Sequence, residues 1–406
     1  MQLLLSVCAL VGITSAAPAT EAAFSLSARR ALPNHQTLAH LSARKIRRDG
    51  KTGNFSTAID NQLYWYANFT VGNSSNLELL IDTGSSDLLL NNGVYVPSKY
   101  ETAFNGNTTF SISYEGVDRQ GFGFETINGT VQNDLVSAGG LTVTNQTIGN
   151  STSFEYFDVP PLSSANPGDG IVGFCFQGDS VFEPPALPWF FNLCSQKLIS
   201  ACRFGLAFGT RGVGQLVVGK YAKKLIDGPV VSIPNIGGNS SYAVYGDVTL
   251  NDTIVLENQT IIMDVGTDNI QAPIEQATEV FKLLNYQTQT LTEAPTPFDP
   301  GLTITVLNGF FNCNNPPSLG SKSQLKKGEK ATVFEVSKDV WGVFNNTATN
   351  CTSILGGTNG ITVGNVSAWL LGQSFFAGHY IDFYTPHNGN ETMISFAKLK
   401  HPGDGS

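Results

Sequence analysis

Two short segments of the sequence place an aspartate at the end of an apolar run, two residues before a glycine. The first is LELLIDTGSSDLL, residues 77–89, with Asp82, and the second is TIIMDVGTDNIQAP, residues 260–273, with Asp264. A carboxyl group in this setting lies where the backbone approaches closely and the side chain is partly desolvated. Two such carboxyls brought together cannot both ionise easily, so they share one proton. One can then act as a base on a bridging water while the other donates a proton to a carbonyl oxygen.

The two segments belong to an internal repeat. Asp82 is followed 91 residues later by Gly173, the end of GIVG, and Asp264 is followed 108 residues later by Gly372, the end of WLLG. One Asp-Thr-Gly segment alone is typical of an ordinary turn, so the repetition carries the prediction. We expect two related lobes, residues 49–232 and 233–406, each contributing one aspartate from an equivalent turn.

The elements that must position these aspartates are predicted to be mainly strands. Short alternating or apolar runs are separated by clusters of Gly, Asn, Pro and Ser, as in LELLI, FSISY, GQLVVG, TIVLE, TIIM and HYIDFYT. A helix is expected over 273–284, where one face is apolar, and another within 188–200. The predicted fold class is all-β with minor helices.

The first 48 residues differ from the rest of the chain. Residues 3–13 are apolar and are followed by TSAAPA, which predicts a secretory signal peptide over 1–17. Residues 18–48 are basic and end in Arg47 and Arg48, whereas the chain without residues 1–48 has a net charge of −14. We expect a basic propeptide over 18–48, held by the acidic body and cut after this pair, with a solvated basic linker as the alternative.

The remaining composition indicates an exported protein without a membrane anchor. No later run approaches the roughly 18 apolar residues of a membrane span, and the C-terminus is polar. The acidic body makes nucleic acid an unfavourable partner. Fourteen Asn-x-Ser/Thr sequons are candidate glycosylation sites of a secreted, extracellular product: Asn54, Asn68, Asn73, Asn107, Asn128, Asn145, Asn150, Asn239, Asn251, Asn258, Asn345, Asn350, Asn365 and Asn390.

Cysteine usage agrees with export. Five cysteines remain after the signal peptide. Cys313 and Cys351 enclose a loop and are a candidate disulfide; Cys194 and Cys202 are a second candidate, which would leave Cys175 free. The connectivity cannot be deduced from sequence alone.

Several motifs in order, at appropriate spacing, resemble those of the pepsin-like aspartic proteases, particularly the secreted fungal members. IDTGSSDL resembles the first active-site motif of that family, and MDVGTD falls 182 residues later, where the second is expected. DGIVGF and WLLGQSFF resemble the segments that support each active-site loop, and SISYEG resembles the start of the flap hairpin. The resemblance covers nearly the whole chain after residue 48. It implies a bilobal fold with an active-site cleft between the lobes.

The resemblance also implies roles for individual residues. Asp82 and Asp264 would hold the nucleophilic water, and Tyr114 would be the flap tyrosine that closes over the substrate. Cys313 and Cys351 would form the disulfide of the C-terminal lobe. Support of the two aspartates, by hydrogen bonds or by room for a tight turn, would come from Thr83, Gly84, Ser85, Gly266 and Thr267.

The function implied is that of an endopeptidase made as a zymogen, acting on extended peptides at acidic pH. Its partners would be protein or peptide substrates and its own propeptide, and it would be a monomer with no cofactor, metal or membrane. A zinc protease is disfavoured because no H-E-x-x-H motif is present, and no G-x-S-x-G nucleophile elbow occurs either.

The sequence departs from the family pattern around one predicted cleft. Val265 stands where the family has Thr or Ser, so one hydrogen bond worth about 0.5–1.5 kcal/mol is missing, although the shape is nearly the same. Further departures are Leu89, Glu115, Asp268 and Gln373. They support the alternative, a catalytically silent pepsin-like protein that binds a peptide or another protein in its cleft.

Overall fold

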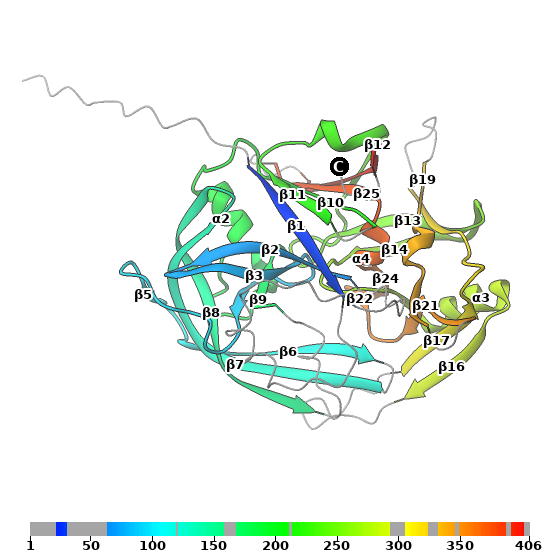
Figure 1. Cartoon of the computed structure of the whole chain (residues 1–406), viewed down its shortest axis with the longest axis horizontal. Coiled ribbons are helices and arrows are strands. Elements are labelled where there is room, and N and C mark those ends of the chain that lie inside the picture. The colour runs from blue at the N-terminus through cyan, green and yellow to red at the C-terminus, as the bar shows by residue number, and fades with distance from the viewer. Residues whose placement is uncertain are drawn as a thin grey trace, which may run out of the picture.

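The computed structural model describes residues 22–30, 63–118, 121–157, 168–210, 213–292, 305–323, 332–345, 349–386 and 391–401. Most of these residues lie in the strands of two large sheets (Figure 1). The predicted signal peptide, most of the predicted propeptide and the dibasic pair lie outside the described residues. The chain is all-β with few helices, as predicted.

The larger sheet has fourteen strands and takes segments from both halves of the chain. Strand β2 also pairs with β7, so the N-terminal part of this sheet folds over on itself. In spatial order its strands are β12 (Ile226–Pro234), β26 (Met393–Leu399), β25 (His379–Tyr384), β10 (Arg203–Phe208), β11 (Val213–Val218), β1 (Ala22–Arg30), β2 (Leu63–Val71), β3 (Ser74–Asp82), β9 (Gly170–Gly173), β4 (Leu88–Leu90), β8 (Leu141–Phe157), β7 (Gly121–Ala138) and β5 (Thr102–Ala103), with β6 (Thr109–Asp118) paired to β7.

The second sheet has ten strands and forms most of the C-terminal lobe. Its strands in spatial order are β16 (Gln287–Thr292), β17 (Thr305–Asn312), β21 (Asn350–Thr358), β15 (Ile270–Pro273), β24 (Trp369–Leu371), β14 (Thr253–Met263), β13 (Ala243–Leu250), β18 (Leu319–Ser323) and β19 (Val333–Glu335), with β20 (Gly342–Asn345) paired to β21. A small ribbon joins β22 (Thr362–Val363) to β23 (Val366–Ser367). The runs TIVLE and TIIM, which look separate in the sequence, form the single strand β14.

The helices are short. The predicted helix over 273–284 is α3 (Ile274–Leu284), with Pro273 just before its first turn and the apolar face buried. The predicted helix within 188–200 is only α2 (Trp189–Ser195), because Lys197 adopts a left-handed conformation with φ 55° and the chain turns back there. The other helices of the described residues are α4 (Gln373–Phe376) and the 3-10 turns η3 (Gln177–Asp179), η4 (Lys223–Leu225) and η5 (Lys338–Val340).

The internal repeat has a structural counterpart in each lobe. Strand β3 runs parallel to β9, so Asp82 lies beside Gly173. Strand β14 runs parallel to β24, and the Asp264 N–H donates to the Leu371 carbonyl at 3.1 Å. The strands that follow the two aspartate turns, β4 and β15, pair antiparallel with β9 and β24. The apolar-apolar-Gly segments therefore hold the two aspartate turns in equivalent settings.

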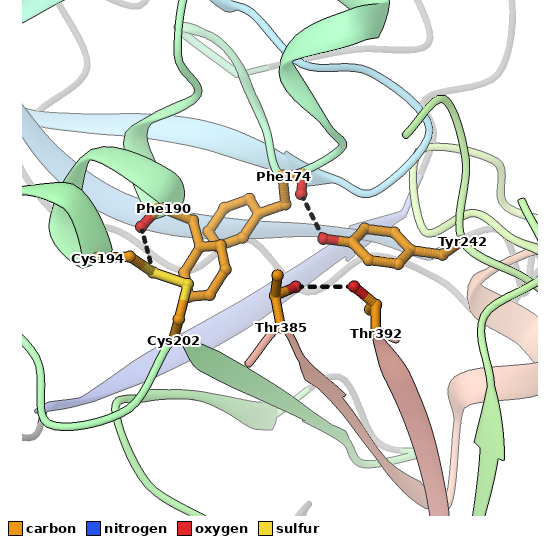
Figure 2. Close-up of a disulfide and its surroundings, with 7 residues drawn as sticks. All are labelled: Phe174, Phe190, Cys194, Cys202, Tyr242, Thr385 and Thr392. Carbon is orange, nitrogen blue, oxygen red and sulfur yellow. Dashed lines mark hydrogen bonds between the residues drawn. A yellow bond between two sulfur atoms is a disulfide. The ribbon is translucent and has the colours of Figure 1, made fainter. Parts of the chain in front are cut away.

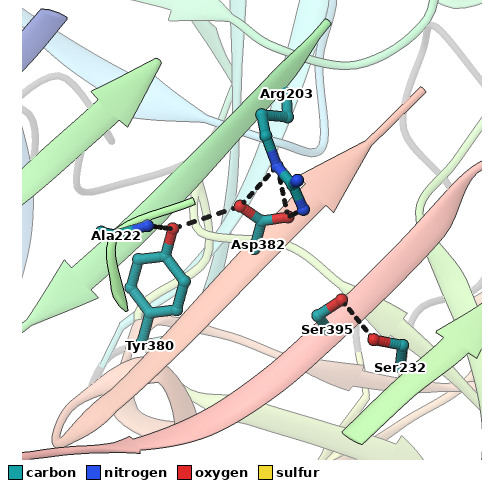
Figure 3. A network of polar contacts seen from close by, with 6 residues as sticks. All are labelled: Arg203, Ala222, Ser232, Tyr380, Asp382 and Ser395. Atoms are coloured by element: carbon teal, nitrogen blue, oxygen red, sulfur yellow. Dashed lines mark hydrogen bonds and ion pairs between the residues drawn. The ribbon is translucent and has the colours of Figure 1, made fainter. Parts of the chain in front are cut away.

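Strands β10 and β25 join the two halves of the chain through a buried ion pair (Figure 3). The Arg203 guanidinium binds Asp382 with Nη2–Oδ2 at 2.7 Å, and Asp382 is fully buried. Asp382 also accepts from the Tyr380 hydroxyl, which in turn accepts the Ala222 N–H. The guanidinium lies over the ring of Tyr221, 4.9 Å from its centroid. This network fixes the register of the sheet that connects the lobes. The predicted lobe boundary between residues 232 and 233 lies within β12 and stays a prediction.

Two disulfides reinforce the lobes. Cys194 forms a disulfide with Cys202, next to the packed rings of Phe174 and Phe190 (Figure 2). Beside these rings, the Tyr242 hydroxyl donates a hydrogen bond to the Phe174 carbonyl at 3.0 Å. Cys313 bonds to Cys351 in the ten-stranded sheet. Cys175 is a buried free thiol.

Strand β1 comes from the segment predicted to be a propeptide. It pairs antiparallel with β11 on one side and with β2 on the other. In Figure 1 it crosses the middle of the molecule as a single blue strand. Residues 22–30 are therefore an integral part of the central sheet in this form of the chain.

Candidate active site

The two aspartates predicted from the repeat hold equivalent sets of hydrogen bonds. Asp82 accepts the Gly84 N–H at 2.8 Å and the Ser85 hydroxyl. Asp264 accepts the Gly266 N–H and the hydroxyl of the third residue after it, Thr267, both at 2.8 Å. Each carboxyl group thus has one oxygen fixed by a backbone amide and the other by a hydroxyl. These donors orient both groups before any ligand is bound.

Each turn glycine lies against the aspartate of the opposite lobe. A Cβ on Gly84 would be 2.5 Å from Asp264 Oδ1, and a Cβ on Gly266 would be 2.2 Å from Asp82 Oδ1. Real Cβ atoms do not approach other atoms so closely, so any side chain at either position would push the carboxyl groups apart. The two turns therefore face each other with their aspartates in one site, as the repeat predicted.

A single hydroxyl joins the two turns. Thr83 Oγ1 donates to the Met263 carbonyl at 2.9 Å and accepts the Val265 N–H at 3.0 Å, and Thr83 is buried. Val265 is fully buried and has no polar side-chain atom to return the interaction. The crossed hydrogen bonds expected of a symmetrical site are thus made from one lobe only.

The electrostatics of the site favour a shared proton. Burial and the neighbouring Asp264 carboxylate raise the pKa of Asp82 well above its usual range, against the opposing effects of Ser85 and Gly84. A hydrogen bond between the two carboxyl groups raises it further. Two carboxyl groups in contact are coupled, so the pair behaves as one unit. It supplies an acid and a base at one point.

Other acidic groups surround the first turn. Burial raises the pKa of Asp87 to about 6, although Ser180 Oγ donates to it at 2.6 Å and the Val181 N–H at 2.8 Å. Burial, Asp87 and Asp264 together raise the pKa of Asp179 to about 6. These hydrogen bonds of Asp87 attach the loop after β9 to the turn that carries Asp82. The sequence analysis did not predict a role for Asp87. The feature that could have indicated one is the presence of a second aspartate in the motif IDTGSSDL.

Gln373 is also part of the site. Its side chain is buried, and its Nε2 donates to the Val265 carbonyl, while its backbone N–H donates to the Thr267 carbonyl at 2.8 Å. In the sequence, Gln373 was noted only as a departure from the pattern of the resembled family. Among the other departures, Asp268 is buried, and its backbone carbonyl accepts from Ser374.

The predicted flap segment lies in the long hairpin of β6 and β7, in which Tyr114 pairs with Glu125. In Figure 1 this hairpin runs along the lower edge of the molecule toward β16 and β17. The Tyr114 side chain lies outside the described residues, so its role stays a prediction.

The predicted glycosylation sites are distributed over the surface. Asn54 and Asn390 lie outside the described residues, as does the side chain of Asn345. Three sequon asparagines are half-buried: Asn128, Asn150 and Asn350. The others are exposed: Asn68, Asn73, Asn107, Asn145, Asn239, Asn251, Asn258 and Asn365. The geometry therefore leaves these side chains open to modification, and their occupancy stays a prediction.

The described parts of the chain contain no group of three or more His, Cys, Asp or Glu side chains arranged to hold a metal ion. Within the same residues, no helix is long and apolar enough to cross a membrane.

Two facing aspartate turns, each backed by an apolar-apolar-Gly strand in its own lobe, define the class of protein. The model of the eukaryotic aspartyl protease family matches residues 64–399, and the chain belongs to that family.

Individual relatives agree with this assignment. Secreted aspartic protease 4 of Candida albicans is 29% identical over 245 residues, which cover 52% of this chain and 54% of the relative. Rhizopuspepsin-4 of Rhizopus niveus is 29% identical over 244 residues, 55% of this chain and 57% of the relative. Pepsin-2B of Gadus morhua is 23% identical over 348 residues, 82% of this chain and 95% of the relative. The match thus spans little more than half the length of the two fungal relatives.

Proposed function

We propose that the chain is a secreted aspartic endopeptidase that hydrolyses peptide bonds in protein or peptide substrates at acidic pH. The observation that carries this proposal is the pair Asp82 and Asp264, held face to face with matched donors. The ionised carboxyl group takes a proton from a water between them, and the protonated one donates to the oxygen of the scissile carbonyl. The attacking group is water, so no covalent enzyme intermediate forms.

The geometry supports distinct roles for the surrounding residues. Ser85 and Thr267 fix which carboxyl oxygen bears charge, because each donates to the oxygen that its glycine N–H does not reach. The glycines leave room for the carboxyl group of the opposite turn, so both aspartates can face one substrate carbonyl. The family resemblance assigns to the β6–β7 hairpin, with Tyr114, the role of closing over the bound peptide and excluding water.

Strand β1 supports synthesis as a zymogen. Residues 22–30 fill a place in the central sheet between β2 and β11, and the basic segment that contains them precedes an acidic body. The propeptide then remains bound through the pairing of residues 22–27 with β11 and of residues 27–30 with β2 until the chain is cut after Arg48. Export follows from the predicted signal peptide over 1–17, and a relative named as secreted supports it. The mature product acts as a glycosylated monomer.

The experiment is an acid-cleavage assay on the processed protein. Wild type should degrade a denatured protein between about pH 3 and 6, and a statine-containing peptide should inhibit it. Asp82→Asn and Asp264→Asn should each abolish cleavage while leaving the far-UV circular dichroism spectrum unchanged. Absence of wild-type cleavage, with removal of residues 1–48 verified by mass spectrometry, would refute the proposal.

A second candidate is a silent protein that binds a peptide in the same cleft. The one-sided hydrogen bonding at Val265 favours it, because this turn lacks the second crossed hydrogen bond. The same assay separates the two functions: a silent protein binds the statine peptide without cleaving the substrate.

A further inference from the structure

Both backbone polar groups of Val265 are held by buried side chains. Its N–H donates to Thr83 from the opposite lobe at 3.0 Å, and its carbonyl accepts from the Gln373 amide of its own lobe. Gln373 is 2% exposed and Val265 is fully buried, so neither interaction competes with bulk water. The residue that lacks a hydroxyl therefore has its peptide groups fixed by two others.

Gln373 forms hydrogen bonds to both sides of the turn that carries Asp264. Its side chain holds the Val265 carbonyl and its backbone N–H holds the Thr267 carbonyl, one on each side of Gly266. Gly266 and Thr267 are the residues that donate to the Asp264 carboxyl group. Fixing both carbonyls therefore fixes the direction in which these two donors point.

The amide orientation follows from chemistry. Only the nitrogen end of a carboxamide can face a carbonyl oxygen, because two acceptors repel each other. Gln373 Oε1 is buried and has no hydrogen-bond partner among the described residues. The side-chain nitrogen therefore donates to the Val265 carbonyl, whereas the buried side-chain oxygen has no partner there, which costs stability.

In the described part of the N-terminal lobe, no side-chain amide holds the aspartate turn in this way. The residue that follows its supporting glycine is Phe174, whose ring packs against Trp189, Phe190 and Phe204. The turn in that lobe carries Thr83, whose hydroxyl makes the cross-lobe hydrogen bonds. Among the described residues, the aspartate turn that a side-chain amide supports is therefore the one in the lobe whose crossed hydroxyl is missing.

We propose that Gln373 is a positioning residue that replaces the turn-fixing hydrogen bond absent at Val265. This inference rests on the proposed endopeptidase function. Gln373→Met, which keeps the length of the side chain but not its donor, should lower kcat about tenfold with KM within about twofold, since one buried hydrogen bond to the turn is lost. Gln373→Asn keeps the amide but is too short to reach the carbonyl, so it should lose about as much.

The most informative measurement is whether a second substitution, Val265→Thr, restores the kcat that Gln373→Met loses. By equivalence with Thr83, which donates to the residue before Asp264, a threonine at 265 would donate to the Ile81 carbonyl before Asp82. Val265→Thr should therefore restore most of the kcat of Gln373→Met. A purely structural role predicts independent, multiplying effects of the two substitutions.

Hydrogen exchange of the peptide that spans residues 260–273 supplies a readout independent of cleavage. Its amides should exchange faster in Gln373→Met, and Val265→Thr should slow them again. Unchanged kcat and exchange in both Gln373 variants, or a loss that Val265→Thr does not restore, would overturn the inference. A wild-type protein that does not cleave, but shows this exchange pattern, would refute the proposed function and leave the positioning role supported.

Discussion

The backbone N–H of Val265 donates to the Thr83 hydroxyl at 3.0 Å, across the junction of the two lobes. The same hydroxyl donates to the Met263 carbonyl at 2.9 Å. One side chain therefore sets the spacing between the turn that carries Asp82 and the turn that carries Asp264. A symmetrical site would have two such hydroxyls, whereas here Val265 stands at the second position and Thr83 supplies the only one of the pair.

Thr83→Val should be far more harmful than its shape suggests. It removes both cross-lobe hydrogen bonds and leaves a buried N–H and a buried carbonyl unpaired, at about 1–3 kcal/mol each. We expect a lower melting temperature and a loss of kcat, measured by calorimetry and by peptide cleavage. Thr83→Ser, which keeps the hydroxyl, is the matched control. Equal behaviour of the two variants would show that the hydroxyl does not hold the lobes.

The ion pair of Arg203 and Asp382 is predicted to stabilise the junction rather than the chemistry. Asp382→Asn leaves a partly buried guanidinium without its carboxylate, which should cost about 2–4 kcal/mol of the free energy of unfolding. Chemical denaturation measures this loss. The double variant Arg203→Met, Asp382→Leu removes both charges and should recover part of the stability. If Asp382→Asn unfolds at the same denaturant concentration as wild type, the pair contributes nothing.

His379 should limit stability in acid. Burial against Phe375 and Phe334, together with Lys398, lowers the pKa of His379 from 6.5 to about 4, although Glu335 and the Phe375 carbonyl oppose the shift. The unfolded chain therefore binds a proton before the folded one does, and stability falls as the pH drops from about 6.5 to about 4, by about 3 kcal/mol in total.

His379→Gln removes this titration and keeps a donor for the Phe375 carbonyl. Urea unfolding as a function of pH should show a flatter acid limb for the variant than for wild type. Parallel curves for the two proteins would mean that His379 titrates normally in the folded state.

Asp87 should act in the opposite direction. Its pKa is raised by burial from 3.8 to about 6, so its contribution to stability is fully present below pH 3.8 and is lost as the pH rises through about 6. The loss amounts to about 3 kcal/mol. Asp87→Asn, which remains uncharged, should not lose this stability between pH 4 and 7, roughly the range of the titration. If the His379→Gln protein, with Asp87 intact, is as stable at pH 7 as at pH 4, this prediction is contradicted.

The features that depend on local sequence patterns could mostly be predicted. The period-3.6 apolar face indicated α3, and the repeated Asp-x-Gly segments indicated two equivalent turns that the strand pairing brings into one site. The helix expected within 188–200 is confirmed as α2, but its end at Ser195 could not be read from the sequence, because the chain turns at Lys197, which adopts a left-handed conformation. A residue other than Gly or Asn gives little warning of such a turn.

Contacts between residues that are far apart in the chain could not be predicted from sequence patterns. Arg203 and Asp382 are 179 positions apart and belong to ordinary strand sequences, so neither shows its partner. Gln373 was visible as an unusual residue, but its hydrogen bond to Val265 exists because the first residues of α4 lie against the turn that carries Asp264. Both kinds of contact arise only when the two halves of the chain fold together.

The most direct test of the shared-proton dyad is the pH dependence of kcat/KM for the processed enzyme. A pair that holds one proton should give a bell-shaped profile with two apparent pKa values, and both Asp82→Asn and Asp264→Asn should reduce the rate by several orders of magnitude across it. A profile with a single ionisation, or substantial activity in either variant, would contradict the central claim that the two carboxyl groups act as one unit.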